Sequence, residues 1–151
     1  MKSTVENAED SITFSEKLKG YFILTRPAQL IWLDIFVALS IYAVIAQQMP
    51  NIHYLLFIIC AVLADAGACT INDLGDLESD RLSTESSRRD RPLPRGIVSS
   101  QGAKYQALVL FILGLAIALY LDVYVFIIVF ILIIISYQYS MDPLKQSSSI
   151  K

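Results

Sequence analysis

Residues 53–71 read HYLLFIICAVLADAGACTI, and this stretch decides the fold class. A helix needs about 20 apolar residues to cross a bilayer, and the stretch approaches that length with Asp65 as its one acidic residue. It shows no two-residue alternation and is too long for a strand of a membrane barrel. Because a backbone in hydrocarbon must pair its polar groups internally, we expect a transmembrane helix here.

Similar apolar runs occupy residues 28–47, 105–121 and 122–139. The whole chain is 55% hydrophobic and only 17% charged, which is unusual for a soluble domain of 151 residues. We therefore predict an all-α, polytopic membrane protein with four transmembrane helices. Residues 1–17 are a polar lead-in without the apolar core of a signal peptide. Residues 18–145 form the transmembrane domain, with a long loop at 72–104, and residues 146–151 are a tail.

The basic residues all fall on one side of this predicted topology. All 12 Lys and Arg residues lie before the first run, in the 72–104 loop or after the fourth run. By the positive-inside rule, both termini and the long loop are expected to be cytoplasmic. We expect the lipid bilayer as a partner, and no nucleic acid. Cys60 and Cys69 share the second run and are too far apart to bridge, and no zinc-type cluster accompanies them.

The acidic segment after the second run carries the predicted chemistry. If the helix continues past Ile71, Asp73, Asp76 and Asp80 lie on one face, and Asn72 stacks above Asp76 and Asp80. Like charges at such spacings repel each other, and a bound cation removes the repulsion. Mg²⁺ prefers oxygen ligands and is often held by carboxylates together with substrate phosphates. A solvated acidic helix end is the simpler alternative; we favour a Mg²⁺ site.

Arginines follow the acidic segment, notably Arg81, Arg88 and Arg91. They contribute to topology, but guanidinium groups also bind phosphate bidentately, so their position beside the carboxylates indicates a diphosphate ligand. Pro92, Pro94 and Gly96 are expected to end the helix in a turn. Ser99 or Ser100 is then expected to cap the next helix.

Five short motifs together resemble a known family. Asn72, Asp73, Asp76 and Asp80 match N-D-x-x-D-x-x-x-D, and residues 67–73 resemble the G-C-T-I-N-D stretch around it. Residues 91–96 resemble R-P-L-x-x-G, residues 25–27 an R-P entry to the first span, and residues 139–145 Y-S-x-x-P-L-K. In this order, from about residue 18 onward, they resemble the UbiA family of intramembrane prenyltransferases.

The resemblance implies a Mg²⁺-dependent transfer of a prenyl group from a prenyl diphosphate to an aromatic, glycerol phosphate or tetrapyrrole acceptor. The isoprenoid tail would lie in a lipid-open cavity between the helices. On this basis the expected residues fall into three overlapping groups. The catalytic residues are Asp73, Asp76 and Asp80; the metal ligands are Asn72, Asp73, Asp76 and Asp80; and the diphosphate-binding residues are Asn72, Arg81, Arg88, Arg91 and Lys145.

Two departures from the family pattern bear on function. Asp65 stands where many quinone-type relatives carry an arginine, and an intramembrane carboxylate, like Asp34 in the first run, commonly has a function. The family's second aspartate motif is absent from this sequence. The chain would then be a fragment, which we favour, one half of a split enzyme, or half of a homodimer. A terpene cyclase, a non-catalytic subunit that binds lipid diphosphate, and a transporter are the competing functions.

Overall fold

The structure is a computed structural model that describes residues 12–30, 35, 39–40 and 51–140. Every regular element among these residues is a helix, which agrees with the predicted all-α class. Three helices are long: α5 (Ile52–Gly75), α8 (Ser100–Leu121) and α9 (Val123–Ser140). Four are short: α2 (Phe14–Leu24), α3 (Pro27–Gln29), α6 (Leu77–Leu82) and α7 (Ser86–Arg89).

The three long helices are long and apolar enough to cross a membrane, with 24, 22 and 18 residues. At about 1.5 Å per residue, each is comparable to the hydrocarbon core of about 30 Å. They confirm the predicted spans at 53–71, 105–121 and 122–139, with ends displaced by up to five residues. The predicted first span, 28–47, lies mostly outside the described residues, so the count of four spans stays a prediction.

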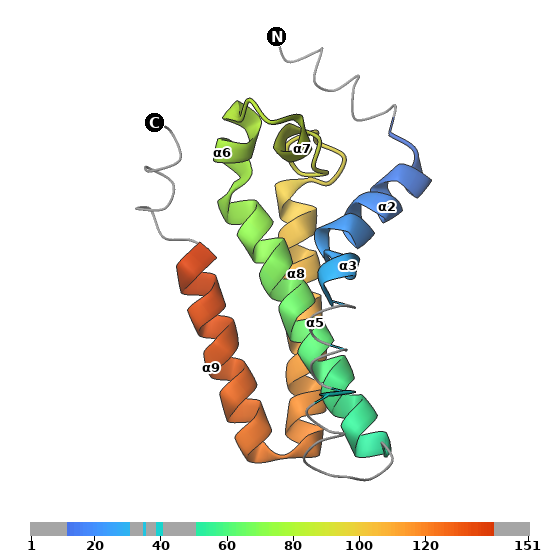
Figure 1. The fold of residues 1–151 in the computed structure, drawn as a ribbon, viewed down its shortest axis with the longest axis vertical. Coiled ribbons are helices and arrows are strands. Elements are labelled where there is room, and N and C mark those ends of the chain that lie inside the picture. The colour runs from blue at the N-terminus through green and yellow to red at the C-terminus, as the bar shows by residue number, and fades with distance from the viewer. Residues whose placement is uncertain (1–11, 31–34, 36–38, 41–50, 141–151) are drawn as a thin grey trace.

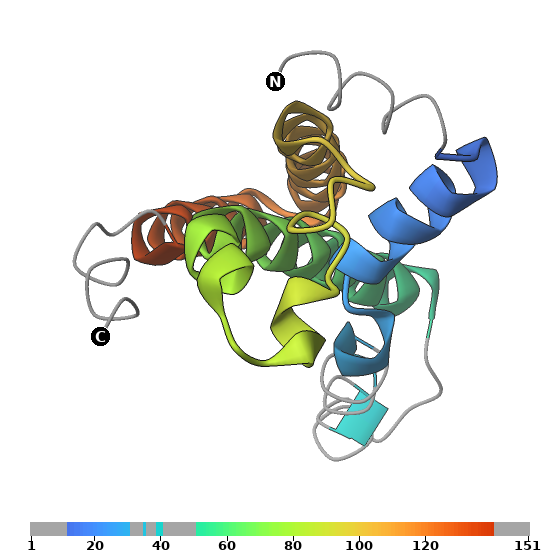
Figure 2. The ribbon, with the colours of Figure 1, turned by 90° about the horizontal axis from the view of Figure 1, so that it is seen from above.

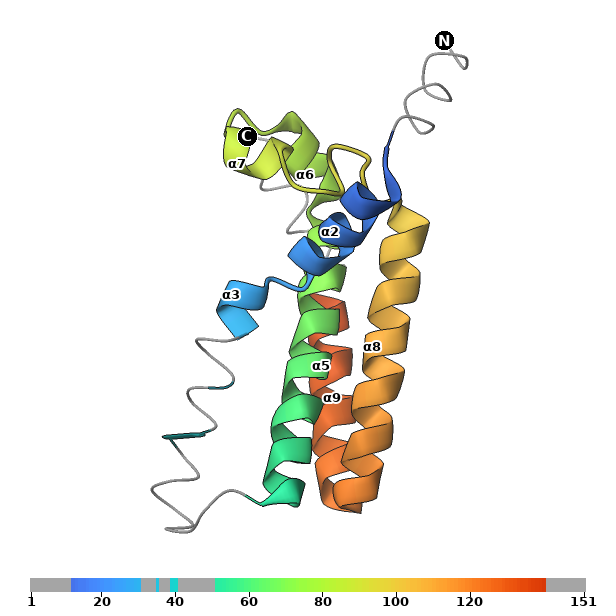
Figure 3. The same ribbon diagram turned by 90° about the vertical axis from the view of Figure 1, so that its right-hand side faces the viewer.

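The long helices stand side by side and the short helices gather at one end (Figure 1). Asp122 alone joins α8 to α9 at the opposite end, and its Oδ1 accepts a hydrogen bond from the Tyr124 amide at 2.7 Å. Seen along the bundle, α5 has α9 on one side and α2 and α3 on the other (Figure 2). Turned by 90°, the view shows α8 running alongside α5 over most of its length (Figure 3).

Small residues allow α5 and α8 to approach closely. A Cβ added at Gly67 would lie 2.5 Å from a ring carbon of Phe111, which is closer than real contacts allow. At Gly114 the backbone carbonyl accepts a hydrogen bond from the Cys60 thiol, with a sulfur–oxygen distance of 3.3 Å. Packing through small residues is typical of membrane helices.

A small hydrophobic core lies at the end of the bundle that carries the short helices. Leu24 of α2, Leu93 and Val98 of the connecting loop, and Ala103 of α8 are each at most 2% exposed. The loop turns at Gly96, whose φ of +74° suits glycine. Ser99 caps α8 by accepting the Gly102 amide at 3.0 Å, so the predicted turn and cap are both confirmed.

Helix α2 begins at Phe14, inside the region predicted as a polar lead-in. Its start is fixed by Thr13, whose amide donates to the Glu16 carboxylate at 2.8 Å. The helix exposes Phe14, Leu18 and Phe22 in one stripe and buries Gly20 and Leu24 on the other side. Helix α2 therefore begins four residues before residue 18, the predicted start of the transmembrane domain.

Candidate functional site

The acidic segment continues α5 and then changes direction. Helix α5 extends past Ile71 to Gly75, which meets the condition on which the shared face of the aspartates was predicted, and α6 follows at once. The Asp76 amide bonds to the Asn72 carbonyl at 3.0 Å, and the Asp80 amide bonds to the Asp76 carbonyl at 2.8 Å. Asp76 has φ −85° and ψ −2°, so the chain bends there while keeping helical hydrogen bonds (Figure 1). The acidic residues therefore remain about one helical turn apart.

Two of the aspartates are buried and paired with arginines. Asp73 is 5% exposed and Asp80 is 1% exposed. The Arg26 guanidinium donates to Asp73 Oδ1 at 2.5 Å, while Arg91 Nη1 donates to Asp80 Oδ2 at 2.9 Å and to Asp73 Oδ1 at 3.4 Å. Buried charges require such partners. The sequence analysis expected a bound cation to offset the repulsion between these carboxylates. In this structure Arg26 and Arg91 provide positive charge beside them.

The small core positions each member of this ion-pair cluster, which we define as Arg26, Asp73, Asp80 and Arg91. Arg26 follows the buried Leu24 by two residues, and Arg91 precedes the buried Leu93 by two residues. Asp73 is next to Leu74, which packs against the same core. Arg26 itself adopts a left-handed conformation, with φ 49°, directly before Pro27 at the start of α3. Packing of apolar neighbours therefore brings together charges from three distant parts of the chain.

The environment of the cluster shifts the pKa values of Asp80 and Arg26. Burial raises the pKa of Asp80, and the nearby Asp76 and Asp73 carboxylates act in the same direction, against the opposing charges of Arg91 and Arg88. Burial acts to lower the pKa of Arg26, but its hydrogen bond and charge interaction with Asp73 outweigh this and raise it. The three carboxylates are thus close enough to repel one another, as the spacing predicted.

Asn72 and Asp76 occupy the half-buried part of the site. Asn72 Nδ2 donates to Asp76 Oδ2 at 3.3 Å, which brings the amide and the carboxylate together. In the described part of the chain, no three His, Cys, Asp or Glu side chains gather closely enough to hold a metal ion. The oxygen donors nevertheless suit a hard cation, and the charges of Asp76 and Asp73 act on the buried Asp80 carboxylate. The donor chemistry therefore fits Mg²⁺, and the four-ligand set stays a prediction.

The predicted diphosphate-binding arginines separate into two kinds. Arg91 lies in the ion-pair cluster, whereas Arg81 and Arg88 pair with Glu78 and Glu85 of their own short segments, at 3.4 and 3.1 Å. Both of those arginine side chains are 49% exposed. Lys145 and Asp34 lie outside the described residues.

Arg26 is a cluster member that the sequence did not place in the site. The motif at residues 25–27 marked this arginine as an entry to the first span, and nothing in the sequence connected it to Asp73. The structure makes that connection across 47 residues of chain. Sequence spacing could not have found it, because the partners share no helix.

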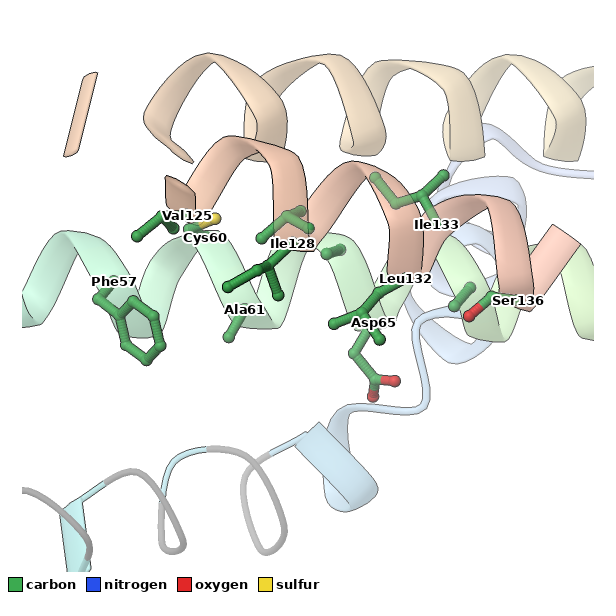
Figure 4. A pocket seen from close by; sticks show the side chains of 12 residues that line it. Phe57, Cys60, Ala61, Asp65, Val125, Ile128, Leu132, Ile133 and Ser136 are labelled. Atoms are coloured by element: carbon green, nitrogen blue, oxygen red, sulfur yellow. The ribbon is translucent and has the colours of Figure 1, made fainter. Parts of the chain in front are cut away.

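An apolar cavity of about 440 Å³ lies between α5 and α9. Its walls come from Phe57, Ala61 and Ala64 of α5 and from aliphatic residues of α9 such as Ile128 and Leu132. The oxygen-bearing side chains in this lining are Asp65 and Ser136 (Figure 4). Asp65 projects from α5, the helix that also carries Asn72 and Asp73.

Apolar helices of membrane-spanning length, with a buried acidic and basic cluster at one end, define an integral membrane protein of the helical-bundle class. A sequence model of the UbiA prenyltransferase family matches residues 34–151. The chain belongs to this family.

Curated relatives of the chain are archaeal enzymes. It is 38% identical over 103 residues to the digeranylgeranylglyceryl phosphate synthase of Thermococcus onnurineus, which covers 68% of this chain and 36% of the relative. It is 35% identical over 101 residues to the synthase of Methanoculleus marisnigri, covering 67% and 34%. It is 30% identical over 129 residues to that of Sulfurisphaera tokodaii, covering 85% and 45%. No solved structure gives a significant match.

The chain therefore spans about a third of the length of the first two relatives.

Proposed function

We propose that this chain forms the part of a prenyltransferase that binds a prenyl diphosphate with Mg²⁺ at the cytoplasmic end of α5 and α6. The observation that carries the proposal is the ion-pair cluster, in which Asp73 and Asp80 are almost completely buried with Arg26 and Arg91 at one end of an apolar bundle. Buried ionisable groups in such a place commonly mark a functional site.

The metal would be held by Asn72, Asp76 and Asp80, which follow one another at single-turn spacing. Asp73 was predicted as a further ligand and catalytic residue. Its contact with both Arg26 and Arg91 favours a different role, in which it holds these two guanidinium groups in place. When bound, Mg²⁺ supplies Lewis acidity that stabilises the departing diphosphate.

Arg91 is the residue of this chain that we assign to the diphosphate. Its side chain is 32% exposed, although the carboxylates that it contacts are buried. The remaining donors of this planar group can therefore reach a ligand that approaches from outside, and guanidinium groups bind phosphate oxygens in a bidentate manner. Arg26 is equally exposed and offers a second donor on the other side of Asp73.

The relatives' name indicates the class of substrate. Digeranylgeranylglyceryl phosphate synthase makes, by its name, a glyceryl phosphate that carries two geranylgeranyl groups, so its acceptor is a glyceryl compound. We extend this to the present chain and propose a long isoprenoid diphosphate as donor and a glyceryl lipid as acceptor. A complete active site would include the second aspartate motif that the family resemblance implies, supplied by a further polypeptide segment or by a second copy.

Titration calorimetry with the purified full chain in detergent tests the proposal. The ligand is geranylgeranyl diphosphate, with saturating Mg²⁺ or with EDTA. We expect Mg²⁺ to tighten binding at least tenfold, and Asp76→Asn to abolish that gain. Asp90→Asn is the matched control because Asp90 is exposed in the same loop. Equal affinity with and without Mg²⁺, or equal losses in both variants, would refute the site.

A further inference from the structure

Asp65 is an ionisable residue in the membrane-spanning part of α5 that the proposed diphosphate site does not use. It lies ten residues before the end of α5 at Gly75, about 15 Å along the helix and therefore deep within a bilayer. Among the described residues it forms no ion pair with Lys or Arg, and its hydrogen-bond partner is the Cys69 thiol at a long 4.0 Å. A carboxylate is costly at this depth unless it has a polar partner.

The cavity between α5 and α9 gives Asp65 access to a ligand. Its walls are otherwise almost entirely apolar, and Ser136 on α9 is the second oxygen-bearing side chain of the lining (Figure 4). A ligand that fills this space must therefore be mostly hydrocarbon. It must also carry a group that can satisfy a carboxylate, because with a purely apolar ligand the long contact to the Cys69 thiol would be the one hydrogen bond of Asp65 among the described residues.

Helix geometry connects Asp65 to the proposed metal site. Asp65, Asn72 and Asp76 are separated by seven and four residues, so they follow one face of α5 and its continuation. Asn72 lies about 10 Å further along the axis. A hydroxyl oxygen would lie about 2.7 Å from the Asp65 carboxylate and about 3.2 Å from the reacting carbon. These two contacts together span more than half of the distance from Asp65 to Asn72. The diphosphate group of the donor would then occupy the rest of the distance, between the reacting carbon and Asn72.

We propose that Asp65 binds the hydroxyl group of a lipid alcohol and so selects the acceptor; this rests on the proposed function. In the transfer step, the alcohol oxygen forms a bond to C1 of the prenyl group. The bond between C1 and the diphosphate oxygen breaks, its electron pair leaves on the diphosphate, and the hydroxyl proton passes to the Asp65 carboxylate. An acceptor with its own carboxylate would meet like-charge repulsion at this position.

Photo-crosslinking of the full chain in lipid nanodiscs tests the assignment. One probe is a long-chain alcohol that carries a diazirine next to the hydroxyl end, and the matched probe is its methyl ether, which cannot donate a hydrogen bond. We expect the alcohol to label peptides of α5 and α9 at least fivefold more than the ether. Asp65→Leu should remove this preference, Asp65→Asn should reduce it, and Asp122→Asn, at the opposite end of the bundle, should retain it.

Two results would overturn the assignment. One is equal labelling of the wild-type protein by alcohol and ether, and the other is a preference that persists in correctly folded Asp65→Leu protein, judged by its circular dichroism. Geranylgeranyl diphosphate binding, measured on the same proteins, separates this inference from the proposed function. Unchanged Mg²⁺-dependent binding in Asp65→Leu together with a lost alcohol preference supports both. Failure of the wild type to bind the diphosphate counts against the proposed function alone.

Discussion

Two pairs of arginines in this chain look alike in sequence and differ in the structure. Arg26 and Arg91 contact carboxylates that are almost completely buried and come from distant parts of the chain. Arg81 and Arg88 contact exposed glutamates three residues away in their own segments. The difference teaches that arginines of one basic loop can differ: Arg91 joins a buried cluster, whereas Arg81 and Arg88 pair with nearby glutamates at the surface.

The difference arises from the apolar neighbours of each arginine. Leu24 and Leu93 enter the small core and carry Arg26 and Arg91 with them, whereas Leu82, next to Arg81, is 70% exposed. Ion pairs on an exposed helix contribute little to stability, about 0.3–0.5 kcal/mol. Breaking a buried pair leaves an uncompensated charge and costs several times more.

The largest expected effect comes from removing the packing that positions Arg91. Leu93→Ala should lower the free energy of unfolding by about 3 kcal/mol, because a fully buried leucine is lost and a cavity remains. Leu82→Ala is the matched control and should change it by less than about 0.5 kcal/mol. Unfolding in mixed SDS and detergent micelles measures both. Equal changes would show that the core does not hold the loop.

The next effect comes from Asp73, the carboxylate shared by Arg26 and Arg91. Asp73→Ala should lower the free energy of unfolding by about 2 kcal/mol, which is less than for a completely buried pair because both arginines can reach water. Asp90→Ala, in the exposed loop, should have almost no effect. If the two variants unfolded alike, the ion-pair cluster would contribute nothing to the fold.

The smallest effect is expected at the exposed arginines. Arg81→Ala should change the free energy of unfolding by no more than about 0.5 kcal/mol, because it removes an exposed pair on a short helix. Its effect should disappear at high salt, where exposed charges are screened. A loss comparable to that of Asp73→Ala would remove the distinction between the two pairs of arginines.

The fold class, the turn and the helix cap could be predicted from the sequence because they depend on neighbouring residues. Continuous apolar runs, the Pro92–Gly96 turn and the Ser99 cap all follow from local chemistry, and the structure contains each of them. The start of α2 at Phe14 lies within residues 1–17, which were expected to be a polar lead-in, and no helix was expected there. Its capping interaction at Thr13 and Glu16 was the missed signal.

The site could be predicted only in part. Helical spacing correctly placed Asp73, Asp76 and Asp80 within reach of each other's charge. The partners of the buried aspartates could not be derived, because Arg26 and Arg91 reach them through tertiary packing rather than through a shared helix. Spacing also could not show that Asp73 contacts two guanidinium groups, those of Arg26 and Arg91.

The most direct test of the central claim is the Mg²⁺-dependent affinity of geranylgeranyl diphosphate for Arg91→Ala compared with Arg88→Ala. Both variants remove one arginine from the same loop, but only Arg91 lies in the ion-pair cluster. The account predicts at least a tenfold loss of affinity for Arg91→Ala, which corresponds to about 1.4 kcal/mol, and at most about a threefold loss for Arg88→Ala. Equal losses, or a larger loss for Arg88→Ala, would contradict it.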